Sequence, residues 1–103
     1  RAESRGERVI CFAHMPLMPP DGQFTLWNNG QIAALLQRYP CVRAFLAGHH
    51  HKGGAHRFGS VLHFIFQGMI EGPDNHYAIV EVYPDKLVIR GYGAQRDETL
   101  RWL

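Results

Sequence analysis

Residues 41–54 read CVRAFLAGHHHKGG, an apolar run that stops at Gly48 and is followed by three histidines, a lysine and two glycines. The run 41–47 shows no polar alternation, which is typical of a β-strand covered on both faces. Because a glycine breaks the run, the histidines come directly after the end of this strand. The stretch therefore predicts a buried strand that carries polar side chains at its carboxyl end.

A second run of the same kind, RVICFA at residues 8–13, ends at His14 and a proline-rich loop. Between the two runs, residues 27–40 predict an amphipathic helix, with Asn28 or Asn29 as N-cap and a proline as its end. The apolar residues at helical spacing are Ile32, Leu35, Leu36 and Tyr39. Strand, loop, helix and strand make a βαβ unit, whose two strands are parallel.

Three further strands are expected at residues 60–68, 76–83 and 86–92. The last two form a hairpin around YPDK, and the tail 93–103 is expected to pack a short segment back on the sheet through Leu100 and Trp102. The predicted fold class is α/β, with a βαβ unit extended by antiparallel strands. Residues 1–103 are interpreted as a single domain.

The composition indicates a globular chain, since 46% of its 103 residues are hydrophobic and 19% are charged. The net charge is +2 and the basic residues form no run, so no nucleic-acid partner is expected. No apolar stretch approaches the roughly 20 residues of a membrane span. Cys11 and Cys41 lack a C-x-x-C spacing and are expected to be buried thiols in a reducing, cytoplasmic setting.

The predicted chemistry comes from the edge where the two parallel strands end. There the βαβ unit places His14 beside the histidine cluster, 35 positions later in the sequence. In an extended segment residues i and i+2 point to the same side, so His49 and His51 can converge with His14 where His50 cannot. Three imidazoles suit a divalent transition metal such as Zn, Mn or Fe. Gly48 is expected to let the backbone come close to a bound ion, and Gly53 and Gly54 to let the chain leave the site by dihedrals that other residues resist.

Three imidazoles make an incomplete site, because a zinc ion needs a fourth ligand and a two-metal hydrolase normally has a bridging carboxylate. No aspartate follows a predicted parallel strand; the four are Asp21, Asp74, Asp85 and Asp97. The missing carboxylates are therefore expected outside this chain. Three readings stay open: the metal-binding half of a hydrolase, a non-catalytic interaction module that keeps the fold of such a hydrolase, and a structural zinc site in an unrelated α/β domain.

The segments VICFAHMPLMP, residues 9–19, and VRAFLAGHHHKGG, residues 42–54, resemble the last two signature blocks of the calcineurin-like metallophosphoesterases. Within that superfamily, AGHHHKGG at 47–54 and GMIEGPDNHYAIVEVYPDKLVIRGYG at 68–93 are most similar to the manganese-dependent ADP-ribose/CDP-alcohol diphosphatases. The resemblance runs from Val9 to Gly93. It implies one half of a metallophosphatase α/β sandwich.

The resemblance further implies that His14 and His49 bind one metal and that His51 binds the other, so that the complete enzyme holds two divalent ions, Mn, Fe or Zn. It implies hydrolysis of a phosphodiester or diphosphate bond in a small-molecule substrate. The family's earlier blocks, D-x-H, G-D-x-x-D and G-N-H-E/D, are absent. The chain is therefore expected to be the carboxyl-terminal half, inactive alone, and paired with the missing half or with a second copy.

Other side chains near the cluster have more modest expected roles. His50 and Lys52 lie within reach of phosphate, and His56 leaves the site in a loop where it can face substrate. His63 lies in an apolar strand and is expected to be a hydrogen-bonded core residue. Phe24 and Trp27 are expected to pack at the entry to the helix.

Overall fold

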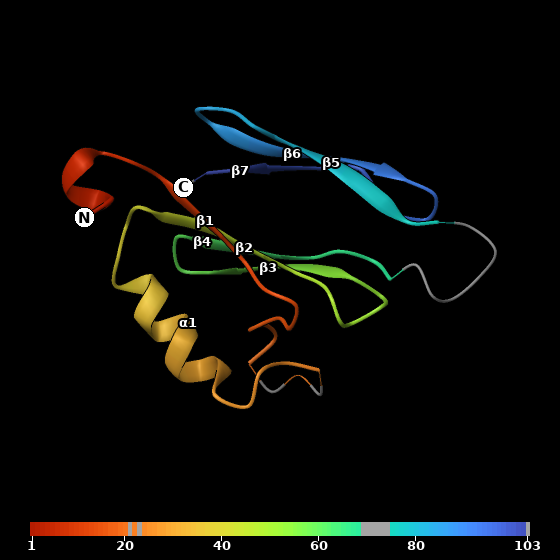
Figure 1. Cartoon of the computed structure of the whole chain (residues 1–103), viewed down its shortest axis with the longest axis horizontal. Helices are drawn as coiled ribbons and strands as arrows, with labels where there is room; N and C mark the ends of the chain where they lie inside the picture. The colour runs from red at the N-terminus through yellow and green to blue at the C-terminus, as the bar shows by residue number, and fades with distance from the viewer. Residues whose placement is uncertain (21, 23, 69–74, 103) are drawn as a thin grey trace.

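The structure, a computed structural model, describes residues 1–20, 22, 24–68 and 75–102. Two β-sheets lie in separate layers, and a helix covers the outer face of the first sheet (Figure 1). The predicted α/β class and sandwich arrangement are confirmed. In chain order the elements are η1 (Glu3–Arg5), β1 (Val9–Phe12), α1 (Asn29–Gln37), β2 (Val42–Ala47), β3 (Gly54–Phe58), β4 (Val61–Ile65), β5 (Tyr77–Val82), β6 (Lys86–Tyr92) and β7 (Glu98–Arg101).

The first sheet has the order β1-β2-β4-β3. Strands β1 and β2 are parallel, as the βαβ unit predicts, and β4 is also parallel to β2. This third parallel strand was expected to be antiparallel. The difference arises because the chain first forms β3, an edge strand antiparallel to β4, and then returns through β4. Strand β3 was interpreted as a loop, since most of its side chains are exposed and its sequence has no apolar pattern.

The second sheet has the order β5-β6-β7 and is antiparallel throughout. The predicted hairpin joins β5 to β6 around Pro84 and Asp85. The tail packs back as expected, because β7 pairs with β6 and the Trp102 ring nitrogen donates to the Tyr83 carbonyl at 3.0 Å. This sheet therefore covers one face of the first sheet with a continuous three-stranded layer.

Two apolar clusters lie on the two faces of the first sheet. The cluster under α1 is built from Leu17, Met18, Ala33, Val42, Phe45, Ala47 and Val61. The cluster between the sheets is built from Ala44, Leu46, Leu62, Phe64, Leu87 and Ile89. Strands β2 and β4 contribute to both clusters, which explains why their sequences lack polar alternation. Both predicted central strands are therefore buried on two sides.

Helix α1 begins directly after Asn28, one of the two asparagines expected as its N-cap. Asn28 occupies the N-cap without a side-chain hydrogen bond. The buried amide of Asn29 instead donates to the carbonyls of Leu17 and Pro20 at 2.9 and 2.8 Å. The loop after His14 is thus tied to the first turn of the helix. No helix in these described segments is long and apolar enough to cross a membrane.

Only part of the apolar face predicted for α1 packs against the core. Ile32 and Leu36 pack against the core, whereas Leu35 and Tyr39 are exposed. Trp27 is 89% exposed, so the expectation that it packs at the helix entry is wrong. Its position in the loop before the helix leaves its ring beyond the reach of the core under α1.

Candidate functional site

His14 and His49 lie side by side at the carboxyl edge of the first sheet. Pairing of β1 with β2 continues beyond both strands, since the Ala13 amide donates to the Leu46 carbonyl at 3.0 Å and the Gly48 amide to the His14 carbonyl at 2.9 Å. The two exposed imidazoles therefore meet, with His14 Nε2 3.1 Å from His49 Nδ1. The rings are edge to face, with centroids 5.0 Å apart.

This pair has the geometry of two ligands of one metal ion. With metal–nitrogen distances of about 2.0–2.1 Å, two nitrogens in neighbouring octahedral or tetrahedral coordination positions lie about 2.8–3.4 Å apart. The separation of 3.1 Å between His14 Nε2 and His49 Nδ1 falls in that interval. Imidazole nitrogens suit Mn, Fe and Zn alike. The two residues present therefore fit a divalent ion.

The chain turns sharply after Gly48, where an extended segment was expected. His49 has φ of 67°, the His50 amide donates to the Gly48 carbonyl at 2.7 Å, and the Gly53 amide donates to the His50 carbonyl at 2.9 Å. A γ-turn centred on His49 followed by a β-turn explains these bonds. The argument that alternate residues of the cluster share a side is therefore wrong, because it assumed extended backbone.

The glycines around the turn differ in what they do. Gly53 has φ of 73°, and a Cβ there would lie 2.9 Å from the Ile65 carbonyl oxygen, so glycine is required. At Gly48 a Cβ would meet its nearest atom only at 3.7 Å. The unusual backbone expected at Gly53 is therefore confirmed, whereas Gly54 has no positive φ and the second such residue of the turn is His49.

His51 lies at the same edge of the sheet but beside the end of a different strand. Its carbonyl accepts from the Gly68 amide at 3.1 Å, three residues after the end of β4. A Cβ at Gly68 would lie 2.6 Å from the His51 ring, so the imidazole rests on this glycine. Across the ranges that the structure describes, no three His, Cys, Asp or Glu residues are grouped closely enough to hold a metal ion. The structure brings His14 and His49 together, and His51 remains apart from that pair.

His50 and Lys52 border a pocket of about 340 Å³ under the proline-rich loop. The Phe24 ring lies 4.8 Å from the His50 ring and 5.9 Å from that of His49, measured between centroids. Phe24 was expected to pack at the helix entry, and it contacts the histidine turn instead. Only its position in the loop after His14 could have suggested this contact.

His56 and His63 are directly opposite each other on β3 and β4. His56 is exposed, whereas His63 is 3% exposed and neither of its ring nitrogens has a hydrogen-bond partner among the residues placed by the structure. The expectation that His63 is hydrogen-bonded is therefore wrong. Burial lowers the pKa of His63 from 6.5 to about 4, and the nearby His56 contributes to this lowering.

The aspartates that the structure describes lie away from the histidines. Asp85 forms an ion pair with Arg101 at 3.1 Å, and Asp97 accepts from the Gly91 amide at 2.7 Å. Both carboxylates stabilise the second sheet. Asp21 and Asp74 lie outside the described residues, as does the part 69–74 of the segment that carried the family resemblance.

The fold that carries this histidine pair is similar to that of a dimetal phosphatase. A solved dimetal phosphatase from Danio rerio matches 99% of the chain with a TM-score of 0.90 and 30% sequence identity, and the match covers 34% of that protein. No protein-family model matches the chain.

The proteins with similar sequences belong to a narrower group than the fold comparison indicates. The chain is 35% identical to the manganese-dependent ADP-ribose/CDP-alcohol diphosphatase of Xenopus laevis, 37% to that of Oryza sativa and 34% to that of Homo sapiens. These matches cover 98%, 93% and 98% of the chain, which spans 30%, 32% and 31% of the respective relatives. Over nearly its whole length the chain is thus a relative of these diphosphatases, and the resemblance seen in its sequence is confirmed. An unrelated α/β domain with a structural zinc is not supported.

Proposed function

We propose that this chain is the carboxyl-terminal, metal-binding part of a larger dimetal phosphohydrolase domain. In this proposal His14 and His49 hold one divalent ion and His51 contributes to the second. The single observation that carries the proposal is the 3.1 Å separation of His14 Nε2 and His49 Nδ1 at the ends of adjacent parallel strands. The manganese dependence stated in the names of the relatives supports manganese as the ion.

The residues of the chain would hold and orient the reacting groups. Bound divalent ions lower the pKa of water and neutralise charge on phosphoryl oxygens. The hydrogen bond from the Gly48 amide to the His14 carbonyl fixes the two histidine-bearing loops relative to each other. Lys52 and His50 border one pocket beside the pair, which favours a role in binding phosphate oxygens. His56 is proposed to face substrate from the exposed edge strand β3.

The proposed substrate is a small molecule with a nucleoside diphosphate linkage. The relatives are named for ADP-ribose and CDP-alcohols, which share that linkage. Replacement of Lys52 by Met in the longer protein that contains this chain should raise KM or lower kcat for such compounds. Replacement of the exposed Arg38 by Met is the control and should change neither. Unchanged kinetics for the Lys52 variant would remove this lysine from the site.

The remaining ligands are proposed to come from the rest of the domain. Phe12 is 75% exposed on β1, an edge strand of the first sheet, and Leu35 is exposed on α1. These side chains would be covered by the portion that the longer relatives possess, or by a second copy of the chain. A cytoplasmic location is also proposed, because Cys11 and Cys41 are free thiols.

Titration with Mn²⁺ tests the proposed metal ligands. Electron paramagnetic resonance of free Mn²⁺ would give the affinity of the chain and of its His14→Ala, His49→Ala and His51→Ala variants. Loss of a residue that only supports a ligand costs 10- to 100-fold in affinity, so loss of either paired histidine should cost at least about tenfold. His50→Ala is the matched control, from the same turn.

Equal affinity for Mn²⁺ in the wild-type chain and the His49→Ala variant would refute the proposal for the paired site. A loss in the His51→Ala variant that concerns a second, weaker ion would support the division between two ions. An equal loss in the His50→Ala control would show that the turn had been disrupted, and would remove the assignment of individual ligands.

A further inference from the structure

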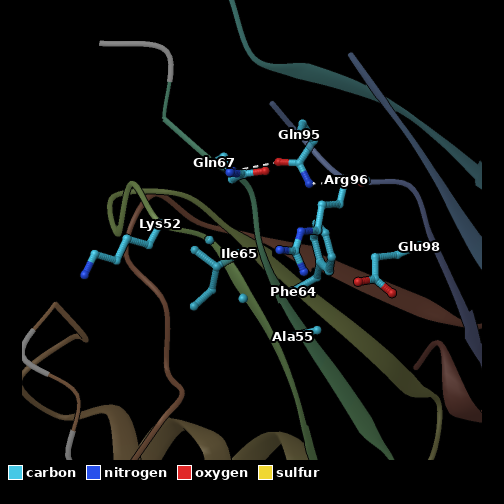
Figure 2. Close-up of a pocket in the computed structure, with 10 residues that line it drawn as sticks. Lys52, Ala55, Phe64, Ile65, Gln67, Gln95, Arg96 and Glu98 are labelled. Carbon is cyan, nitrogen blue, oxygen red and sulfur yellow. Dashed lines mark hydrogen bonds between the residues drawn. The ribbon is translucent and has the colours of Figure 1, made fainter. Parts of the chain in front are cut away.

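A pocket of about 450 Å³ lies between the two sheets, where β3 and β4 meet the connection from β6 to β7. Figure 2 shows the side chains that surround it. We call it the seam pocket and define it by Phe64, Ile65, Gln67, Gln95, Arg96 and Glu98. The exposed Lys52 also borders it, but in Figure 2 its side chain points away from Gln95, Arg96 and Glu98.

The lining combines apolar and hydrogen-bonding groups. Phe64 and Ile65 are buried and supply apolar surface, whereas Arg96 and Glu98 supply a donor and an acceptor. Neither of these two side chains has a hydrogen bond or ion pair within the described ranges. A cation and an anion at one pocket favour an uncharged ligand that both accepts and donates hydrogen bonds. Glu98 would repel a phosphate group and offset its attraction to Arg96.

The walls of the seam pocket are held in place by buried contacts. Gln95 is buried, and its Oε1 accepts from the Gln67 amide at 2.7 Å, which links the second sheet to the end of β4. At Gly53 a Cβ would lie 2.9 Å from Gln67 Cγ, so this wall leaves no room for a side chain. Such fixed walls reduce the conformational entropy that the protein loses when a ligand binds.

The seam pocket is connected to the histidine turn. Gly53 borders the pocket and its amide donates to the His50 carbonyl, so the pocket wall and the candidate metal-binding turn are one continuous segment. Gln67 follows β4, which is two strands away from β1 in the first sheet, at a spacing of about 4.8 Å per strand. A substrate with its phosphates at the histidines can therefore extend toward the seam.

We propose that the seam pocket binds the uncharged part of a nucleoside-containing substrate, the base or the sugar. Arg96 donates to it, Glu98 accepts from it, and Phe64 contributes apolar surface. The identity of the ligand rests on the proposed phosphohydrolase function. The phosphates of the same molecule stay outside the seam pocket, near the histidines and Lys52.

Two-dimensional ¹H–¹⁵N NMR of the 103-residue chain, titrated without metal, tests this proposal. The probes are adenosine, cytidine, ribose and inorganic phosphate. Either nucleoside should shift the amide signals of Gly53, Gly54 and Gln67 and the side-chain amide of Gln95. Shifts with ribose as well would assign recognition to the sugar, and shifts with the nucleosides alone would assign it to the base.

Two variants and a control connect binding to the named side chains. Arg96→Gln and Glu98→Gln should each weaken nucleoside binding about tenfold, as expected for loss of a hydrogen bond to a charged group. Arg38 follows the C-terminal end of α1, on the face of the first sheet opposite the second sheet, so Arg38→Gln should bind as the wild type does. Arg38 and Arg96 are exposed and Glu98 is half-buried at the start of β7, so the fold should persist, and the unchanged remainder of each spectrum would verify it.

The inference is overturned if no nucleoside or ribose shifts these signals, if phosphate shifts them as strongly, or if the two variants bind like the control. The titration contains no metal, so its outcome is independent of the Mn²⁺ measurements. A chain that binds Mn²⁺ through His14 and His49 but binds no nucleoside would retain the proposed function and lose only this inference. A chain that binds a nucleoside in the seam pocket but binds no Mn²⁺ through His14 and His49 would retain the nucleoside site and refute the proposed phosphohydrolase function.

Discussion

His63 should make the chain less stable as the pH falls from 6.5 to 4. The folded state holds this imidazole neutral, with a pKa of about 4, while in the unfolded chain the pKa is near 6.5. Between these values the unfolded state binds more protons than the folded state. The contribution of His63 to the free energy of unfolding therefore decreases as the pH falls, and it is fully lost only below about pH 4. Each pKa unit corresponds to about 1.4 kcal/mol, so the total loss is about 3 kcal/mol.

Urea denaturation followed by circular dichroism at pH 7 and at pH 4.5 would measure this effect. His63→Leu keeps a similar side-chain volume and removes the titrating group, so its free energy of unfolding should fall less than that of the wild type over the same interval. It should also be about 1–2 kcal/mol more stable at pH 7, because two buried nitrogens without partners are removed. His56→Gln serves as a control for the neighbouring imidazole.

Parallel loss of stability in the wild-type chain and the His63→Leu variant would contradict this reasoning. The remaining histidines and carboxylates titrate in both proteins, so only the difference between the two profiles reports on His63. A difference that grows at higher pH would likewise have the wrong sign.

Three further substitutions and one control test packing. Leu46→Ala should lower the free energy of unfolding by about 2–5 kcal/mol, whereas Leu35→Ala on the exposed helix face should change it by less than about 0.5 kcal/mol, both measured by urea denaturation. Gln95→Ala leaves the Gln67 amide without its acceptor and should cost about 1–3 kcal/mol, seen as a lower denaturation midpoint. Gly91→Ala should unfold the second sheet, because its Cβ would overlap the Gln95 carbonyl. Native-state hydrogen exchange should then show faster exchange of the β6 amides. Unchanged protection of these amides would contradict the packing described for Gly91.

The central strands could be predicted because a strand that is buried on both faces has a sequence without polar alternation. Strands β2 and β4 are mostly apolar and show no polar alternation, although β2 contains Arg43 and β4 contains His63, and the hairpin of β5 and β6 carries a turn dipeptide. Strand β3 could not be recognised, since an exposed edge strand needs no apolar pattern and begins with glycine. Its presence decides that β4 runs parallel to β2, so the missed strand also changed the expected topology.

The histidine pair could be predicted for a different reason. Parallel strands end at the same edge of a sheet, so residues directly after β1 and β2 must be neighbours, and His14 and His49 are. The direction of His51 depends on turn dihedrals, and nothing in the local sequence indicates that His49 adopts φ of 67°. The contact of Phe24, and the lack of hydrogen-bond partners for the buried His63 ring among the described residues, depend on long-range packing, which a single sequence does not reveal.

The buried amide of Asn29 has a consequence for the ageing of this protein. Asn29 precedes Gly30, and asparagine is among the side chains that heat degrades by loss of ammonia. Deamidation would replace a donor to two carbonyl oxygens by a carboxylate that faces them, and the resulting repulsion would release the loop that follows His14. A preparation stored warm would then carry a loosened histidine loop in molecules only one mass unit heavier than the fresh ones.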